Sequence, residues 1–209
     1  MTKVLFIQSS PRGQRSRSIQ VAESFLEGLA EARGQLETDT LDLFQADLPP
    51  FDGAALEAKY EILSGSSPSD AHRQAWAKVE AVIDRFTSAD VVVLAVPMWN
   101  FGIPYVLKHF FDVIVQPGYT FSYDPEKGYS GLVTGKTALV AYARGGDYDA
   151  EALQAVDHQQ RYLELILGFV GFGDVRSVTV QPTLMGDEDS KSRKLAGAVA
   201  EARKIGSQL

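Results

Sequence analysis

The amino-acid sequence predicts an α/β protein built on a doubly wound, five-stranded parallel sheet with strand order 2-1-3-4-5 and helices on both faces. Short continuous apolar runs, such as residues 4–7 and 91–96, are typical of strands that are buried on both faces. Segments with apolar residues at helical spacing follow these runs, so that strands and helices alternate five times. No linker interrupts the 209 residues, and we therefore expect a single domain over residues 1–209.

The first half of the chain holds three of the expected strands. Apolar residues recur at helical spacing after the first strand, and Gly34 ends that helix. The second strand alternates less regularly than the others. Prolines and glycines break the chain between residues 44 and 69, which leaves room for one short helix, whereas Trp76 and Phe86 belong to the apolar side of a longer amphipathic helix. The expected elements of this half are strand 4–7, helix 19–33, strand 36–43, helix 54–63, helix 70–87 and strand 91–96.

The second half repeats the pattern with one excursion. Pro104 suits the first turn of a helix that continues through Phe111. The stretch 119–135 is rich in aromatic, glycine and turn residues, which favours a hairpin outside the main sheet. The expected elements of this half are helix 104–111, hairpin 119–135, strand 137–143, helix 152–167, strand 175–180 and helix 188–205.

Composition excludes several classes of function. The chain has no cysteine, which excludes disulfides, thiolate catalysis and iron–sulfur clusters. A net charge of -7 disfavours broad binding to nucleic acid or to an anionic membrane. The histidines are scattered, so we expect no metal site, and no apolar run reaches the length of a bilayer span. The N-terminus lacks the layout of a signal peptide, and we expect a cytoplasmic protein.

Ligands of such sheets bind beyond the carboxyl ends of the strands, where three loops of unusual composition should meet. The first loop carries serines and arginines and enters a helix, a combination that suits a phosphate at the helix N-terminus. The second, residues 97–104, places Trp99, Asn100 and Phe101 between two prolines, as a rigid wall for a planar ring. The third contains Gly145 and Gly146, which let the backbone approach a ligand closely.

Each loop also has an ordinary structural interpretation: a capped helix with solvated arginines, a packed strand-to-helix turn, and a tight glycine turn. Together, the phosphate cradle, the ring wall and the close-approach loop favour a mononucleotide or flavin, of which FMN fits all three. The one glycine of the first loop excludes a dinucleotide fingerprint.

The same loops carry a family resemblance over nearly the whole chain. The sequence resembles the FMN-dependent NADH azoreductases and quinone reductases of the AzoR type, within the flavodoxin-like superfamily. The element Pro97-Met98-Trp99-Asn100-Phe101-Gly102-Ile103-Pro104 is the most specific match. The other matching segments are 9–12, 16–18, 131–136, 144–146 and 167–171.

The resemblance implies roles for particular residues and a single flavodoxin-like FMN-binding domain. The FMN phosphate would be held by Ser10, Ser16, Arg17 and Ser18. The isoalloxazine would be contacted by Met98, Trp99, Asn100 and Phe101, and its pyrimidine edge by Ala143, Arg144, Gly145 and Gly146. Family members are homodimers with each flavin at the subunit interface, and Tyr123 resembles the aromatic residue that the partner subunit presents to the substrate.

Two positions depart from the family pattern. Trp99 stands where relatives usually have tyrosine, and Ala143 stands where serine or threonine is common. The first change is expected to alter flavin stacking and pocket width, and the second to remove a hydrogen bond near the ring. Both bear on the range of substrates.

The resulting hypothesis is an enzyme: an FMN-dependent NAD(P)H oxidoreductase that reduces quinones and azo compounds by two-electron, ping-pong hydride transfer. NADH or NADPH would be the electron donor, and no side-chain nucleophile is expected because the cofactor performs the redox step. Asn100 and the backbone N–H groups near Gly145 and Gly146 would stabilise negative charge on the reduced ring. The alternatives are a single-electron carrier without NAD(P)H-dependent activity of its own, a plain FMN reductase or nitroreductase, and a binding module without flavin.

Overall fold

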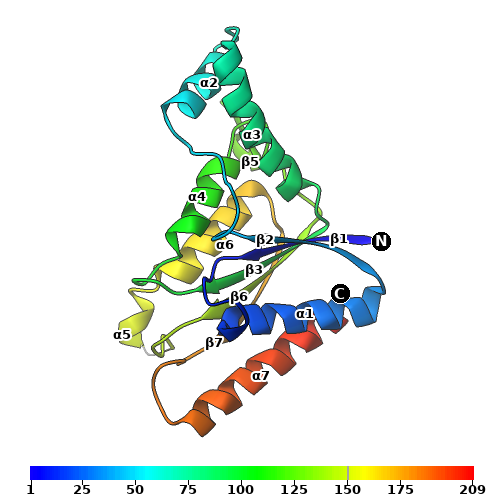
Figure 1. Ribbon diagram of the computed structural model, residues 1–209, viewed down its shortest axis with the longest axis vertical. Coiled ribbons are helices and arrows are strands. Elements are labelled where there is room, and N and C mark those ends of the chain that lie inside the picture. Colours follow the sequence, from blue (N-terminus) through cyan, green and yellow to red (C-terminus); the bar gives the residue numbers. More distant parts are fainter. Residues whose placement is uncertain (150) are drawn as a thin grey trace.

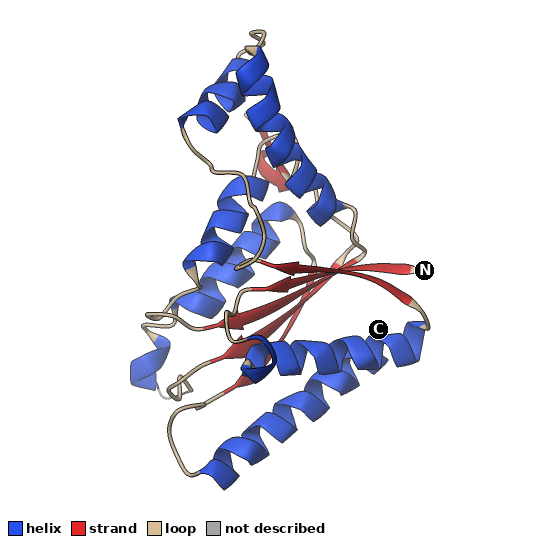
Figure 2. Ribbon diagram, in the orientation of Figure 1, coloured by secondary structure: helices blue, strands red, loops and turns tan. Residues whose placement is uncertain are grey.

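A five-stranded parallel sheet forms the centre of the computed structural model, which describes residues 1–149 and 151–209 (Figures 1 and 2). The strands lie in the order β2-β1-β3-β6-β7, and each neighbouring pair is parallel. When the strands of this sheet alone are counted along the chain, the order is 2-1-3-4-5, which confirms the predicted topology. The strand bounds are β1 Thr2–Gln8, β2 Leu36–Asp42, β3 Val91–Pro97, β6 Thr137–Ala143 and β7 Asp174–Val180.

Helices cover both faces of the sheet, as Figure 2 shows. One face carries α1 (Arg17–Arg33) and α7 (Glu188–Ser207), which cross each other, and the other carries α3 (Asp70–Thr87), α4 (Tyr105–Ile114) and α6 (His158–Val170). The helix α2 (Gly53–Leu63) packs on α3, and this pair projects from the body of the protein (Figure 1). Within the described residues, no helix has both the length and the apolar composition that crossing a membrane requires.

The continuous apolar strands serve two cores at once. In β1, Val4 and Phe6 belong to the core under α1 and α7, whereas Leu5 and Ile7 belong to the core under α3, α4 and α6. Successive side chains of a strand point to opposite faces, so a strand covered on both sides needs apolar residues at every position. This is why the predicted strands were recognisable as short uninterrupted runs.

Glycines allow the close crossing of α1 and α7. A Cβ atom added to Gly28 would lie 2.1 Å from the carbonyl oxygen of Arg203, and one added to Gly206 would lie 2.2 Å from that of Phe25. No real side chain tolerates such distances, so the crossing requires glycine at both positions. The arrangement fixes α7 against α1, whose N-terminus opens at the carboxyl edge of the sheet.

A small antiparallel hairpin, β4 (Phe121–Asp124) and β5 (Gly128–Gly131), confirms the predicted excursion. It docks on the end of α6, where the ring centroids of Phe121 and Phe169 are 4.8 Å apart. A Cβ atom on Gly131 would lie 2.3 Å from the backbone nitrogen of Gly171, so this contact also depends on glycine. The hairpin is thereby attached to the body away from the sheet.

Several predicted ends differ from the structure by one to three residues, and two predictions were wrong in kind. The single helix expected over 152–167 is two helices, α5 (Glu151–Gln154) and α6. The second helix begins because Asp157 caps it by accepting hydrogen bonds from the backbone N–H groups of Gln159 and Gln160. Pro104 is the N-cap of α4 and not part of its first turn, since its ψ of 144° is extended. The short 3-10 turn η1 (Gly13–Arg15) in the first loop was not expected.

Candidate functional site

A cavity of about 220 Å³ lies at the carboxyl edge of the sheet, where four loops meet. These are the loops that follow β1, β3, β6 and β7. The residues that line it are Ser10, Pro11, Arg12, Ser16, Arg17, Pro97, Met98, Trp99, Ala143, Gly145, Thr183 and Leu184. The position is the one at which doubly wound sheets bind ligands.

The N-terminus of α1 supplies hydrogen-bond donors at one end of this cavity. Ser16 is the N-cap, but its side chain makes no capping bond and instead lies 3.1 Å from the Ser18 hydroxyl. The first helical hydrogen bond runs from the Gln20 N–H to the Ser16 carbonyl, so the preceding N–H groups have no acceptor within the helix. Both serines are buried, and the helix dipole adds partial positive charge here.

Arg17 completes this end of the cavity. Its Nη1 atom is buried and, among the described residues, has no hydrogen-bond partner. A buried N–H donor without a partner is costly in free energy, so the position of Nη1 is explained best by a ligand that accepts the bond. Arg12 and Arg15 are exposed, and of these only Arg12 lines the cavity. The end of the cavity at α1 is therefore suited to an anion with several oxygen acceptors.

The loop after β3 makes a strained hairpin turn beside the cavity. Asn100 and Phe101 both have positive φ angles, 48° and 69°, and the flanking Trp99 and Gly102 exchange two backbone hydrogen bonds of 3.0 and 2.9 Å. Positive φ is tolerated by asparagine but is unfavourable for phenylalanine. The Phe101 side chain is half exposed, so the strained backbone of the turn places this ring at the surface and not in the core.

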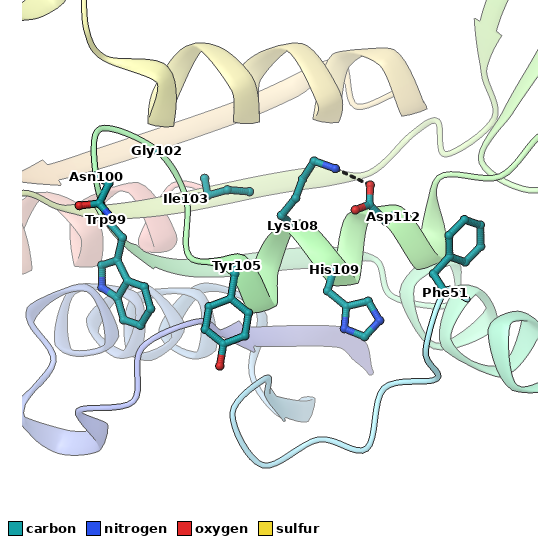
Figure 3. Close-up of a pocket in the computed structure, with 9 residues that line it drawn as sticks. All are labelled: Phe51, Trp99, Asn100, Gly102, Ile103, Tyr105, Lys108, His109 and Asp112. Carbon is teal, nitrogen blue, oxygen red and sulfur yellow. Dashed lines mark hydrogen bonds and ion pairs between the residues drawn. The ribbon is translucent and has the colours of Figure 1, made fainter. Parts of the chain in front are cut away.

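Trp99 belongs to a cluster of three rings with Phe44 and Tyr105, whose centroids are 5.8 to 6.3 Å apart. Trp99 lines both the first cavity and a second, more open one of about 680 Å³, which Figure 3 shows. Further along α4 the second cavity is polar: Lys108 pairs with Asp112 at 2.5 Å. The second cavity is lined by Phe51, Trp99, Asn100, Gly102, Ile103, Tyr105, Lys108, His109 and Asp112.

The loop after β6 contributes backbone to the cavity, as expected from its glycines. Ala143 and Gly145 line it, and the Ala143 carbonyl accepts a hydrogen bond of 2.8 Å from the Met98 N–H, which joins this loop to the one after β3. Arg144 does not line this cavity; its side chain is 4% exposed and pairs with Asp157. Its guanidinium group lies over the ring of Tyr142, and burial raises the pKa of that tyrosine well above its usual range.

The structure therefore brings most of the predicted site residues together. Around the first cavity lie Ser10, Ser16, Arg17, Met98, Trp99, Ala143 and Gly145, and Asn100 lines the second. Ser18 bonds to Ser16, and Phe101 shares the turn with Asn100. Gly146 lines neither cavity. Tyr123 is exposed on the hairpin, where its ring lies 5.0 Å from that of Tyr129, and it also lines neither cavity of its own chain.

Sequence reasoning did not find every residue of the site. Thr183 and Leu184, which follow β7, line the first cavity, and Phe44 and Tyr105 flank Trp99. The loop after β7 ends at the same edge of the sheet as the other loops, and this position was the available signal. No residue pattern distinguished Phe44 from an ordinary packed ring.

Comparison with known proteins gives consistent matches. The family model described as "Flavodoxin-like fold" matches residues 2–205. An FMN-dependent NADH:quinone oxidoreductase from Nitratidesulfovibrio vulgaris is 50% identical over 206 residues, which cover 98% of both chains. The crystal structure of an azoreductase from Bacillus anthracis superposes with a TM-score of 0.91 at 28% identity and covers 100% of both chains. An FMN-dependent NADH-azoreductase from the same species, solved in complex with FMN, gives a TM-score of 0.89 at 28% identity and covers 100% of this chain and 99% of the other.

Proposed function

Because this chain belongs to the flavodoxin-like fold family, in the branch of the FMN-dependent NADH:quinone oxidoreductases, we propose that it is an enzyme of that kind. It binds FMN and uses NADH to reduce quinones and azo compounds. The observation that carries this proposal is the buried Arg17 Nη1 atom, which has no hydrogen-bond partner among the described residues and lies beside the open N-terminus of α1, in a cavity that Pro97, Met98 and Trp99 also line. This pairing matches a phosphate joined to a planar ring.

The phosphate of FMN would be held at the α1 end. Ser10 lies 3% exposed in the cavity wall, and the Ser16 and Ser18 hydroxyls can each turn a donor toward an anion. Arg17 adds a charge-assisted bond through Nη1. Ser9 is not available, because its hydroxyl donates to the Ala95 carbonyl at 2.8 Å.

The ring of FMN would lie between the loops after β3 and β6. Met98 and Trp99 form one wall, and Ala143 and Gly145 form the other, with Arg144 and Gly146 contributing the neighbouring backbone. The Asn100 and Phe101 side chains project from the strained turn at the rim. A rigid apolar wall keeps water away from the ring face and holds it in one orientation.

When bound, FMN supplies hydride transfer, since it accepts a hydride from a nicotinamide and donates one to a quinone or azo acceptor. The chain contributes orientation and electrostatics. The Asn100 amide can donate a hydrogen bond to negative charge at the rim, and the backbone hydrogen bonds between Trp99 and Gly102 fix the turn that carries it. The second cavity, which shares Trp99 with the first, has room for a planar acceptor beside the ring.

Three further features are part of the proposal. Residues 1–209 form a single FMN-binding domain in a cytoplasmic homodimer. The flavin lies at the subunit interface, and Tyr123 faces the substrate bound to the partner subunit. This assignment is supported by the exposure of Tyr123 and Tyr129, which are 61% and 65% exposed on the hairpin although their rings pack partly on each other.

The experiment that tests the function is a steady-state assay of NADH oxidation with a quinone, on apoprotein, on FMN-loaded protein and on riboflavin-loaded protein. Activity that requires FMN, and that appears without any added protein partner, supports the proposal. A protein that binds FMN but oxidises NADH only when a second redox protein is present would instead be an electron carrier.

A further inference from the structure

One side of the first turn of α6 packs against the loops of the candidate site, and there Asp157 and Gln159 are buried. Asp157 caps the helix: its Oδ1 accepts hydrogen bonds from the backbone N–H groups of Gln159 and Gln160 at 3.0 and 3.1 Å. Its Oδ2 pairs with Nη2 of Arg144 at 2.9 Å. The carboxylate therefore joins the start of a helix to the loop after β6.

The guanidinium group of Arg144 forms hydrogen bonds through all three of its nitrogen atoms. Nε donates to Oε1 of Gln159 and Nη2 to Oε1 of Gln160, both at 3.0 Å, while Nη1 lies 3.4 Å from Oε1 of Gln181. The guanidinium group thus connects the loop after β6 to α6 and to the end of β7. Because its donors are used by protein acceptors, the charge is not available to a ligand.

Gln159 carries the connection on to β3. It is 0% exposed, and its Nε2 donates to the Val96 carbonyl at 3.0 Å. The neighbouring His158 N–H donates to the Phe101 carbonyl at 3.0 Å, which ties the strained turn to the same helix. One helical turn therefore holds both loops that form the ring end of the site.

We propose that Arg144 and Gln159 are positioning residues that fix the spacing between the Asn100–Phe101 turn and the glycine loop, and so set the width of the ring-binding slot. This inference rests on the proposed function, because the ring is that of FMN. The strained turn needs outside contacts to persist, and the His158 N–H supplies one to the Phe101 carbonyl. Gln159 and Arg144 hold the helix turn that carries this N–H against β3 and the glycine loop. Apolar side chains could fill the same space, but they could not specify its geometry with directed bonds.

The test compares Gln159→Met with Gln116→Met. Gln116 is also buried, at 1% exposed, and its Nε2 also donates to backbone carbonyls. It lies just beyond the C-terminal end of α4, however, and lines neither cavity of the site. Both substitutions remove a buried amide of the same size, so each is expected to lower the unfolding temperature of the apoprotein. Only Gln159→Met alters the ring end.

The readout is the affinity for FMN and for riboflavin, measured by quenching of flavin fluorescence. Gln159→Met is expected to weaken the binding of both flavins by the same factor, about tenfold. The loss of one buried hydrogen bond costs a free energy of that order. The visible circular dichroism of the bound flavin should also change, because the ring sits differently. Gln116→Met should leave the affinity and the spectrum as they are in the unaltered protein.

Equal affinities and spectra for Gln159→Met and the unaltered protein would overturn the positioning role and leave the proposed function intact. An unaltered protein that bound neither flavin would instead overturn the proposed function. If Gln159→Met does not fold, Asp157→Asn replaces it, since asparagine keeps the cap but removes the charge that faces Arg144. Its control is Asp52→Asn. Asp52 caps α2 through the N–H groups two and three residues further on, as Asp157 does in α6, and has no arginine partner among the described residues.

Discussion

Replacing Arg17 with methionine should separate cofactor affinity from protein stability. The Nη1 atom of Arg17 is buried beside the N-terminus of α1 with no partner among the described residues. A charge-assisted hydrogen bond to a phosphate contributes about 1.5–3 kcal/mol, so its loss should weaken FMN binding by about 10- to 150-fold. Riboflavin, which has no phosphate, should bind Arg17→Met and the unaltered protein equally well.

The stability of the apoprotein should not fall with the FMN affinity. Removing a buried group that has no partner relieves a desolvation cost, so Arg17→Met should unfold at the same temperature as the unaltered apoprotein or at a higher one. Arg15→Met is the matched control, because it makes the same charge change at an exposed position outside the cavity. Its effect on FMN affinity should be small and should disappear at high salt.

The assay is fluorescence titration of both apoproteins with FMN and with riboflavin, together with thermal unfolding. The reasoning would be refuted by an equal loss of affinity for the two flavins, because that result would place Arg17 at the ring and not at the phosphate. It would equally be refuted by a fall in unfolding temperature with unchanged affinity, which would make Arg17 a structural residue.

Three further predictions address the turn, the hairpin and pH. Phe101→Gly should raise the unfolding free energy of the apoprotein by about 1 kcal/mol, because glycine accepts positive φ without strain, and should weaken flavin binding; a loss of stability on chemical denaturation would contradict this. Gly131→Ala should displace the hairpin from Gly171, and so lower both the rate of quinone reduction and the fraction of the protein that sediments as a dimer; unchanged sedimentation would contradict this. The hydrogen bond from Arg85 lowers the pKa of Asp39, so Asp39→Asn should lower the free energy of unfolding by about 0.5 kcal/mol at neutral pH. This difference in stability should vanish as pH falls through the lowered pKa of Asp39, and a difference that grew in acid would refute the assignment.

The fold was predictable because its signals are local. Uninterrupted apolar runs mark strands covered on both faces, and the prediction for β3 was within one residue of the structure. The break at Asp157 was missed since no glycine or proline interrupts the helical period there, and a capping aspartate is a weaker signal within an otherwise periodic segment.

The site was predictable in position and less so in orientation. Parallel strands bring the loops after β1, β3 and β6 to one edge, so residue types that suit a phosphate and a ring were expected to converge. The direction of a side chain is decided by tertiary contacts, and Arg144 turns inward because Asp157 and Gln159 lie there. The positive φ of Phe101 was also unpredictable, since its own preference opposes that conformation.

Anaerobic titration of the FMN-loaded protein with NADH, followed by the visible absorbance of the flavin, tests the central claim most directly. We expect prompt two-electron bleaching at one equivalent of NADH per flavin and full recovery of the absorbance when a quinone is added. Tightly bound FMN that ignored both NADH and NADPH would contradict it and would make the protein a carrier of electrons between other proteins.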